Sequence, residues 1–211
     1  MSVNIPHADG NSDCCAQNQK NKMKNIIIFG APGSGKGTQS DKIIAEFGVE
    51  HISTGDVLRA EIKAGTELGK VAASYINDGN LVPDSLIIDI LASVLDSKGK
   101  DIEGVIFDGF PRTIPQAEAL DKMLKERGEE VSVVIGLEVD DDELVKRIVA
   151  RGKTSGRADD NEETAKKRLD TYYAQTLPLK DFYITQGKYA KIHGMGSIDD
   201  IYDNISKAIK G

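Results

Sequence analysis

The sequence predicts an α/β protein with a parallel central sheet, and three observations support this. The apolar run Ile26–Phe29 does not alternate with polar residues, as expected of a strand buried on both faces. It leads into the glycine-rich segment Gly30–Thr38 and then into a helical pattern that ends near Phe47. From Val49 onward, short apolar runs alternate with helical patterns, which is the signature of βα units.

The other elements follow in chain order. The segment from Thr54 to about Asn80 contains two helical patterns that are interrupted at Gly65, which predicts a small helical insert standing off the sheet. Further strands are predicted at Val105–Phe107, Val131–Leu137 and Tyr189–Ile192, and further helices at Ser85–Asp96, Thr113–Arg127, Asp141–Arg151, Glu162–Thr185 and Ile198–Ile209. In open parallel sheets the ligand lies beyond the carboxyl ends of the strands, so the loops that follow the strands should carry the function.

Size and composition are those of one ordinary globular domain. The chain has 211 residues, 39% of them hydrophobic, and a formal net charge of −7, which argues against nucleic acid as a partner. No apolar run reaches the length of a membrane span, and the N-terminus has no apolar signal core. The two cysteines, Cys14 and Cys15, are adjacent and cannot supply a four-ligand zinc site. We expect a cytoplasmic protein with no zinc site and no membrane partner.

Residues 1–24 are rich in Asn, Gln, Ser and Asp and have little to bury, which predicts a disordered N-terminal extension. Met23 stands immediately before the first strand, so the folded unit could begin there. The sequence leaves open whether the extension is a processed leader, the product of an alternative start or a functional arm. Residues 25–211 are predicted to form a single domain.

The segment Gly30–Thr38 has the chemistry of a phosphate cradle. Glycines let successive backbone N–H groups point at one anion, and the helix N-terminus adds partial positive charge. Lys36 is placed to reach the outer phosphates. A glycine-rich turn with an incidental lysine is the alternative, but the strand before the loop and the helix after it disfavour that reading. The chain is therefore predicted to bind a nucleoside triphosphate.

The residue after the lysine is unusual, because Gly37 stands where many P-loops have Ser or Thr, and the hydroxyl follows at Thr38. In switch GTPases the residue at that place holds Mg²⁺ directly. We therefore expect Mg²⁺ to be held through water or mainly by the nucleotide. The difference argues against a GTPase switch.

Arginine recurs at strand ends and in loops of this acidic chain. An exposed arginine is usually only a solvated charge. A cluster of them would nevertheless suit two nucleotides whose phosphates meet head to head, because a guanidinium binds phosphate bidentately and stays charged. The residues concerned are Arg59, Arg112, Arg147, Arg151, Arg157 and Arg168.

The sequence resembles the adenylate kinases over nearly all of residues 25–211. The segments Gly30–Thr38, Ile52–Arg59, Asp108–Thr113 and Thr154–Asn161 occur in the order and spacing of that family. The resemblance implies a P-loop three-layer fold with a central parallel five-stranded sheet. It also implies a helical NMP-binding insert at residues 53–82 and a short lid at residues 150–160. The expected reaction is direct phosphoryl transfer from Mg-ATP to AMP, which gives ADP from both.

The resemblance also implies a role for each matching residue. The phosphates of ATP would lie on Gly33, Ser34, Gly35, Lys36, Gly37 and Thr38, with Arg151 nearest the adenine and the backbone of Gly196 against that base. AMP would be held by Thr54, Arg59, Asn80, Leu81, Val82, Gly109, Phe110, Pro111, Arg112, Gln116, Arg157 and Arg168. The catalytic set would be Lys36, Arg112, Arg147, Arg157 and Arg168. Asp108 would orient water on Mg²⁺, with a turn-capping aspartate as the alternative.

Two features of the lid and of the reaction follow. The lid has no room for a longer β-hairpin. Asp159 and Asp160 either pair with lid arginines or backbone when the lid shuts, or form a solvated acidic turn. Because the acceptor is an ionised phosphate oxygen, no general base is required. His51 and His193 are accordingly expected to be structural residues.

Two alternative functions remain, one a different nucleoside monophosphate kinase and the other a protein that is not a kinase. A UMP/CMP kinase is the nearest, but such relatives usually carry Ala in place of Thr54, and their sequence after Arg112 differs. A nucleotide-dependent switch without transfer activity would have one nucleotide site and little need for Arg59 and Arg112. The sequence leaves open whether ATP or GTP is the donor. A monomer is expected, because the motifs form one complete site within one chain.

Overall fold

The computed structural model describes residues 24–98, 102–155, 157 and 159–211. All but one residue of the extension expected at residues 1–24, with Cys14 and Cys15, lies outside the described residues. The five-stranded sheet has the order β2-β3-β1-β4-β5, and its strand pairs are parallel. The strands are β1 (Lys24–Gly30), β2 (Glu50–Ser53), β3 (Gly104–Asp108), β4 (Val131–Glu138) and β5 (Tyr189–His193). The expected α/β fold with a parallel sheet is confirmed.

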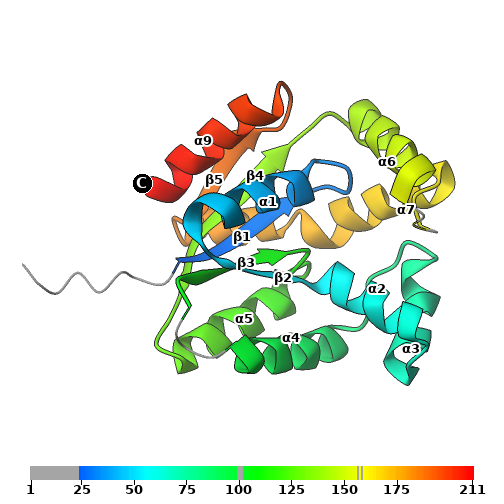
Figure 1. Ribbon diagram of the computed structural model, residues 1–211, viewed down its shortest axis with the longest axis horizontal. Helices are drawn as coiled ribbons and strands as arrows, with labels where there is room; N and C mark the ends of the chain where they lie inside the picture. Colours follow the sequence, from blue (N-terminus) through cyan, green and yellow to red (C-terminus); the bar gives the residue numbers. More distant parts are fainter. Residues whose placement is uncertain (1–23, 99–101, 156, 158) are drawn as a thin grey trace, which may run out of the picture.

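Helices cover both faces of the sheet (Figure 1). One face carries α1 (Lys36–Phe47) and α9 (Ile198–Lys210), and the other carries α4 (Asp84–Lys98), α5 (Ile114–Glu126) and α8 (Leu179–Thr185). Ile26 and Ile28 of β1 pack in the core beneath α1 and α9, whereas Ile27 and Phe29 pack in the core on the opposite face. Because successive residues of a strand point to opposite faces, a strand covered on both sides has no alternation of apolar and polar residues.

The insert is a pair of short helices, α2 (Thr54–Ala64) and α3 (Glu67–Ile76), which stands to one side of the sheet (Figure 1). The break expected at Gly65 is confirmed, since this residue ends α2 with a left-handed φ of 69°. Side-chain hydroxyls cap both helices: Ser53 accepts from the N–H of Asp56, and Thr66 accepts from the N–H of Gly69. The turn chemistry of the sequence therefore fixes where the insert begins and bends.

Two sequence-based predictions of secondary structure need correction. The single helix predicted over Glu162–Thr185 is interrupted: α7 (Glu162–Thr171) is followed by a π-helix at Tyr172–Thr176 and then by α8. Pro178 lacks an N–H to continue α-helical bonding, and the N–H of Leu177 bonds to the carbonyl of Tyr172. The helix predicted over Asp141–Arg151 also continues further, since α6 spans Asp141–Ser155 and thus enters the expected lid.

The crevice of the fold lies at the carboxyl ends of β1 and β3. These strands are neighbours, yet the chain leaves β1 for α1 on one face and leaves β3 for α5 on the other. Such a switch point opens a crevice beyond the strand ends, and in α/β folds it is the usual ligand site. Within the part of the chain that the structure describes, none of the helices is long and apolar enough to cross a membrane.

Candidate active site

The phosphate loop joins β1 to α1 at the mouth of the crevice. Gly33 and Gly35 adopt left-handed φ values of 85° and 95°, which a side chain would strain. Gly35 stands at the N-cap of α1, where no side chain caps the helix and the first turn has no acidic residue. The first N–H groups of α1 are therefore left for an anion.

The side chain of Lys36 folds back over this loop. Its Nζ donates hydrogen bonds to the carbonyl oxygens of Gly30, at 2.8 Å, and of Ala31, at 3.1 Å. Burial removes water from the ammonium group and lowers the pKa of Lys36 to about 8. The negative charge of Asp108 acts in the opposite direction and raises this pKa, but burial has the larger effect. The guanidinium groups of Arg112, Arg168 and Arg151 lower this pKa further, so all three lie within electrostatic reach of Lys36.

Nucleotide binding should take up a proton at alkaline pH. Above pH 8 much of Lys36 is neutral in the free protein, and a phosphate bound beside it favours the charged form and raises its pKa. Calorimetry of ATP binding at pH 8.5, in two buffers of different ionisation enthalpy, should therefore show proton uptake. The uptake should disappear in Lys36→Met and persist in Lys42→Met, which removes a lysine at the surface. Equal heats in both buffers would contradict the prediction.

A single cleft brings together most of the residues expected to hold AMP. It is bounded by Lys36 and Pro32 of the phosphate loop, by the insert, by the turn after β3 and by the π-helix. The expected residues that line it are Thr54, Arg59, Asn80, Leu81, Val82, Gly109, Phe110, Pro111, Arg112, Gln116 and Arg168. Sequence reasoning missed Gly79, Thr171, Tyr172 and Thr176, which also line the cleft but belong to no motif.

The turn after β3 holds Arg112 in the wall of the cleft. Nε of Arg112 donates to the carbonyl of Gly109 at 2.8 Å, and the same carbonyl accepts from Oγ1 of Thr54 at 3.0 Å. A methyl group at Gly109 would come within 2.9 Å of the guanidinium, and the φ of 75° there also favours glycine. Burial, with Arg168 nearby, lowers the pKa of Arg112 to about 10. Its cation is thus partly stripped of water before any phosphate arrives.

Gln116 is buried at the start of α5, with its amide bonded on both sides. Its Oε1 accepts from the N–H of Arg112 at 2.8 Å, and its Nε2 donates to Oδ1 of Asp84 at 2.7 Å. Oδ2 of Asp84 accepts from Oγ1 of Thr113 at 2.9 Å. Sequence reasoning did not single out Asp84, because it lies 32 positions from Gln116 and outside every motif.

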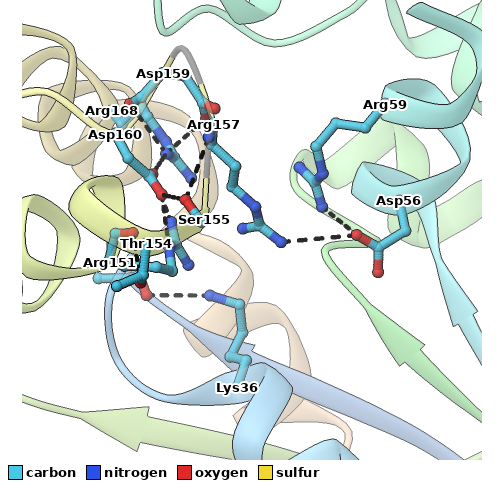
Figure 2. A network of polar contacts seen from close by, with 11 residues as sticks. Lys36, Asp56, Arg59, Arg151, Thr154, Ser155, Arg157, Asp159, Asp160 and Arg168 are labelled. Atoms are coloured by element: carbon cyan, nitrogen blue, oxygen red, sulfur yellow. Dashed lines mark hydrogen bonds and ion pairs between the residues drawn. The ribbon is translucent and has the colours of Figure 1, made fainter. Parts of the chain in front are cut away.

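Charged residues at the junction of α6 and α7 form what we call the lid cluster: Arg151, Asp159, Asp160 and Arg168 (Figure 2). The side chain of Asp160 is fully buried and accepts from Arg151 at 2.7 and 2.6 Å and from Arg168 at 3.1 Å. Arg168 also pairs with Asp159 at 2.7 Å. Burial would raise the pKa of Asp160, but the arginines outweigh it and hold that pKa below its ordinary value. The pairing of these aspartates with lid arginines is confirmed, and the solvated turn was wrong.

Gly152 lets the loop carrying Asp160 lie directly against α6. A Cβ at this position would collide with the carbonyl oxygen of Asp160. Gly152→Ala should therefore push Asp160 away from Arg151 and lower turnover by about tenfold, since small displacements of positioning groups are costly in rate. The measurement is the rate of ATP formation from ADP. Ala150→Ser, on the exposed side of the same helix, should leave it unchanged, and an unaffected Gly152→Ala would contradict the argument.

Arg157 does not line the cleft but points across it, from the lid towards α2 (Figure 2). Its guanidinium lies 3.8 Å from Oδ1 of Asp56, which also accepts a hydrogen bond from Arg59. Lid and insert therefore meet through a shared carboxylate. Sequence reasoning missed Asp56, although it stands within the same motif as Thr54 and Arg59.

Arg147 and Arg151 lie in each other's expected places. Arg151 was expected near the adenine beside Gly196, and Arg147 near the transferred phosphoryl group. Arg147 pairs with Glu143 at 2.7 Å and donates to the carbonyl of Gly194 at 3.4 Å, so it is Arg147 that lies against the segment preceding Gly196. Arg151 instead lies within electrostatic reach of Lys36 and belongs to the lid cluster. The reason is the helix: a turn of α6 separates the two residues, and only the more distal one reaches the lid cluster. Gly196 itself is exposed, with a φ of 119°.

Asp108 ends β3 beside the phosphate loop and provides a carboxylate suited to water-bound Mg²⁺. Burial would raise its pKa, but His51, Lys36 and Arg112 outweigh this and hold the pKa below its ordinary value. His51 lies 3.9 Å away on the neighbouring strand β2, whereas His193 is exposed. Among the described residues, no three or more His, Cys, Asp or Glu side chains gather as a metal-binding group. The carboxylate of Asp108 can accept hydrogen bonds from the water of a hydrated cation.

Comparisons with known proteins agree with this geometry. The model of the adenylate kinase family matches residues 28–188. Curated proteins named adenylate kinase from Parabacteroides distasonis and Bacteroides fragilis are 63% and 64% identical over 187 residues, which are 89% of this chain and 98% of each relative. One from Phocaeicola vulgatus is 65% identical over 188 residues, 89% of this chain and 99% of the relative.

Proposed function

Because the chain belongs to the adenylate kinase family, we propose that the cleft described above is the place where ATP and AMP meet. Adenylate kinase function is reversible phosphoryl transfer, ATP + AMP = 2 ADP, which makes the chain a phosphotransferase of nucleotide metabolism. The alternative of a UMP/CMP kinase is not favoured. One observation carries the proposal: Lys36 and Arg112 come from separate motifs but line the same cleft, and they lie close enough for the charge of Arg112 to lower the pKa of Lys36.

On the donor side, we assign the phosphates of ATP to the loop formed by Gly33, Ser34, Gly35, Lys36, Gly37 and Thr38. Lys36 would leave its carbonyl partners and follow the transferred group. Arg147 would lie nearest the adenine and Arg151 nearest the phosphates, which exchanges the roles expected from the sequence. The contact of Arg147 with Gly194 and the proximity of Arg151 to Lys36 support this assignment.

On the acceptor side, Arg59 and Arg112 would bind the phosphate of AMP and Gln116 would bind the adenine. Arg112, Arg157 and Arg168 would surround the phosphoryl group in flight, where stabilisation of developing charge and positioning carry the catalysis. Arg157 reaches across the cleft towards the insert, which supports a site completed when lid and insert approach. Closure of this kind excludes water as a competing acceptor.

Mg²⁺ is the cation we propose for this site, as Mg-ATP, with Asp108 holding its water. When bound, it would neutralise phosphate charge and help to orient the ATP phosphates. The chain's own groups orient the reactants, and no described carboxylate or histidine is needed to remove a proton from an ionised acceptor. A monomer and a cytoplasmic location stay predictions. Sedimentation at several concentrations would test the first.

The decisive experiment supplies the protein with ADP and Mg²⁺ alone and follows the products by phosphorus NMR. Equal amounts of ATP and AMP with little free phosphate are expected. Free phosphate without ATP would indicate hydrolysis by a switch-like protein. No reaction of ADP, together with transfer from ATP to CMP or UMP, would replace AMP as the acceptor.

A further inference from the structure

Asp84 closes a ring of hydrogen bonds behind the wall of the cleft. It is the first residue of α4, and its carboxylate accepts from Nε2 of Gln116 at 2.7 Å and from Oγ1 of Thr113 at 2.9 Å. Oγ1 of Thr113 in turn accepts from the N–H of Gln116 at 3.4 Å. Gln116 lines the cleft and is only 2% exposed, whereas Asp84 and Thr113 are not among the lining residues. Asp84 therefore acts on the cleft only through Gln116.

The partners of Gln116 allow only one orientation of its amide. The backbone N–H of Arg112 can only donate, and the carboxylate of Asp84 can only accept. Rotating the amide by half a turn would set its NH₂ against the Arg112 N–H and its oxygen against the carboxylate. The first mismatch would set two donors against each other and the second two acceptors, at partly buried groups, which is unfavourable. The ring thus fixes which end of the amide is the donor.

The donor and the acceptor of the Gln116 amide that the ring leaves unused can pair with only one kind of base edge. A carboxamide has two N–H donors and an oxygen with two lone pairs, and the ring uses one of each. One donor and one acceptor are left for the cleft. Adenine presents an amino donor at position 6 beside an acceptor at N1, whereas hypoxanthine and guanine present an acceptor at position 6 beside a donor at N1. A flipped amide would suit the second pattern as well as the fixed amide suits the first.

We propose that Asp84 determines the base specificity of the acceptor site by fixing the orientation of the Gln116 amide. The inference rests on the proposed function, because it takes the base of AMP to lie against Gln116. Asp84 is a positioning residue, which touches no substrate. It selects a purine with a 6-amino group against one with a 6-oxo group.

The test compares AMP with IMP as acceptors, because the two differ only at this edge of the base. Wild-type protein should prefer AMP in kcat/KM. In Asp84→Asn the new side chain has nearly the same shape but can donate or accept, so only the N–H of Arg112 still opposes the flipped Gln116 amide and the preference for one orientation weakens. The AMP/IMP ratio of kcat/KM should therefore fall about tenfold, the size expected for loss of one hydrogen bond to a charged group. Asp89→Asn makes the same change on the exposed side of α4 and should leave the ratio unchanged.

A double-mutant cycle shows whether Asp84 acts through Gln116. In a Gln116→Ala background, Asp84→Asn should no longer change the AMP/IMP ratio. A loss of activity that is equal for AMP and IMP would reveal a merely structural role and overturn the inference, as would an unchanged ratio. Calorimetric binding of AMP and IMP without a donor should reproduce the change, and thermal unfolding of each variant checks that it folds.

Measurements on the wild-type protein alone can also contradict the inference. The inference can therefore be tested even if Asp84→Asn does not fold. Equal kcat/KM for AMP and IMP in the wild type would overturn the role of Asp84 while leaving the proposed function in place. Transfer to neither acceptor would overturn the proposed function, and the inference with it. The two failures are thus distinguishable in one series of measurements.

Discussion

Arg112→Ala is expected to lower kcat for ATP formation from ADP by two to three orders of magnitude, the usual effect of removing one group that stabilises charge in the transition state. The guanidinium lies in the cleft wall, is held by the carbonyl of Gly109 and lies within electrostatic reach of Lys36. Burial lowers the pKa of Arg112, which means that the guanidinium has already lost part of its hydration. Its interaction with an arriving phosphate is therefore stronger than it would be in water. Steady-state kinetics of the forward and reverse reactions would measure the loss.

The fold should survive this substitution, since the bond that Arg112 makes through its backbone N–H to Gln116 is retained in alanine. Arg112→Lys should recover only part of the rate, because an ammonium cannot bind phosphate bidentately. Arg127→Lys, at the far end of α5, serves as the control for changing an arginine. A variant Arg112→Ala with nearly wild-type turnover would remove this residue from the catalytic set.

Asp160→Asn should disable the lid cluster without changing its shape. The carboxylate neutralises Arg151 and Arg168, and an amide in its place would leave two guanidinium groups facing each other. We expect the free energy of unfolding to fall by about 2 kcal/mol, less than for a fully buried pair because the side chain of Arg151 keeps 36% of its surface exposed. Turnover should fall at least tenfold as the lid arginines lose their positions.

Urea unfolding over a range of pH would check the electrostatic origin of this effect. The folded-state pKa of Asp160 lies below its ordinary value, so its contribution is complete above the unfolded pKa, near 4, and is lost as the pH falls through the lowered value. The difference between wild type and Asp160→Asn should therefore be largest near pH 7 and shrink in acid. Glu162→Gln, which removes an exposed carboxylate paired with Lys166, should have little effect at any pH. A difference that does not change with pH would contradict the argument.

The local features of this protein could be predicted from its sequence because local chemistry determines them. Gly33 and Gly35 are needed for the backbone of the phosphate loop, and Gly65 for the bend of the insert, whatever surrounds them. No residue range could be predicted for the strand β2, because Glu50 and His51 give this short edge strand a polar start. The π-helix before Pro178 was missed because its hydrogen-bond pattern leaves no mark in the sequence YYAQT.

The arrangement of side chains between distant segments could not be predicted in the same way. Arg147 and Arg151 share one face of α6, so their spacing does not reveal which of them meets Gly194 and which meets Asp160. The ring around Gln116 depends on Asp84, which belongs to a different helix and to no motif. Periodicity identifies elements, but the partner of a polar side chain depends on how those elements pack.

The carbonyl oxygens that hold Lys36 have a consequence for how readily nucleotides leave. The ammonium of Lys36 is already hydrogen-bonded to Gly30 and Ala31, so a phosphate that binds it would have to displace these carbonyls and would not meet an unsatisfied cation. The net gain from such an exchange is smaller than the full strength of an ion pair. The same carbonyls would be available to receive the lysine again when the product departs, which would ease its release. A reversible reaction, in which each nucleotide is substrate in one direction and product in the other, benefits from a loop that binds phosphate without trapping it.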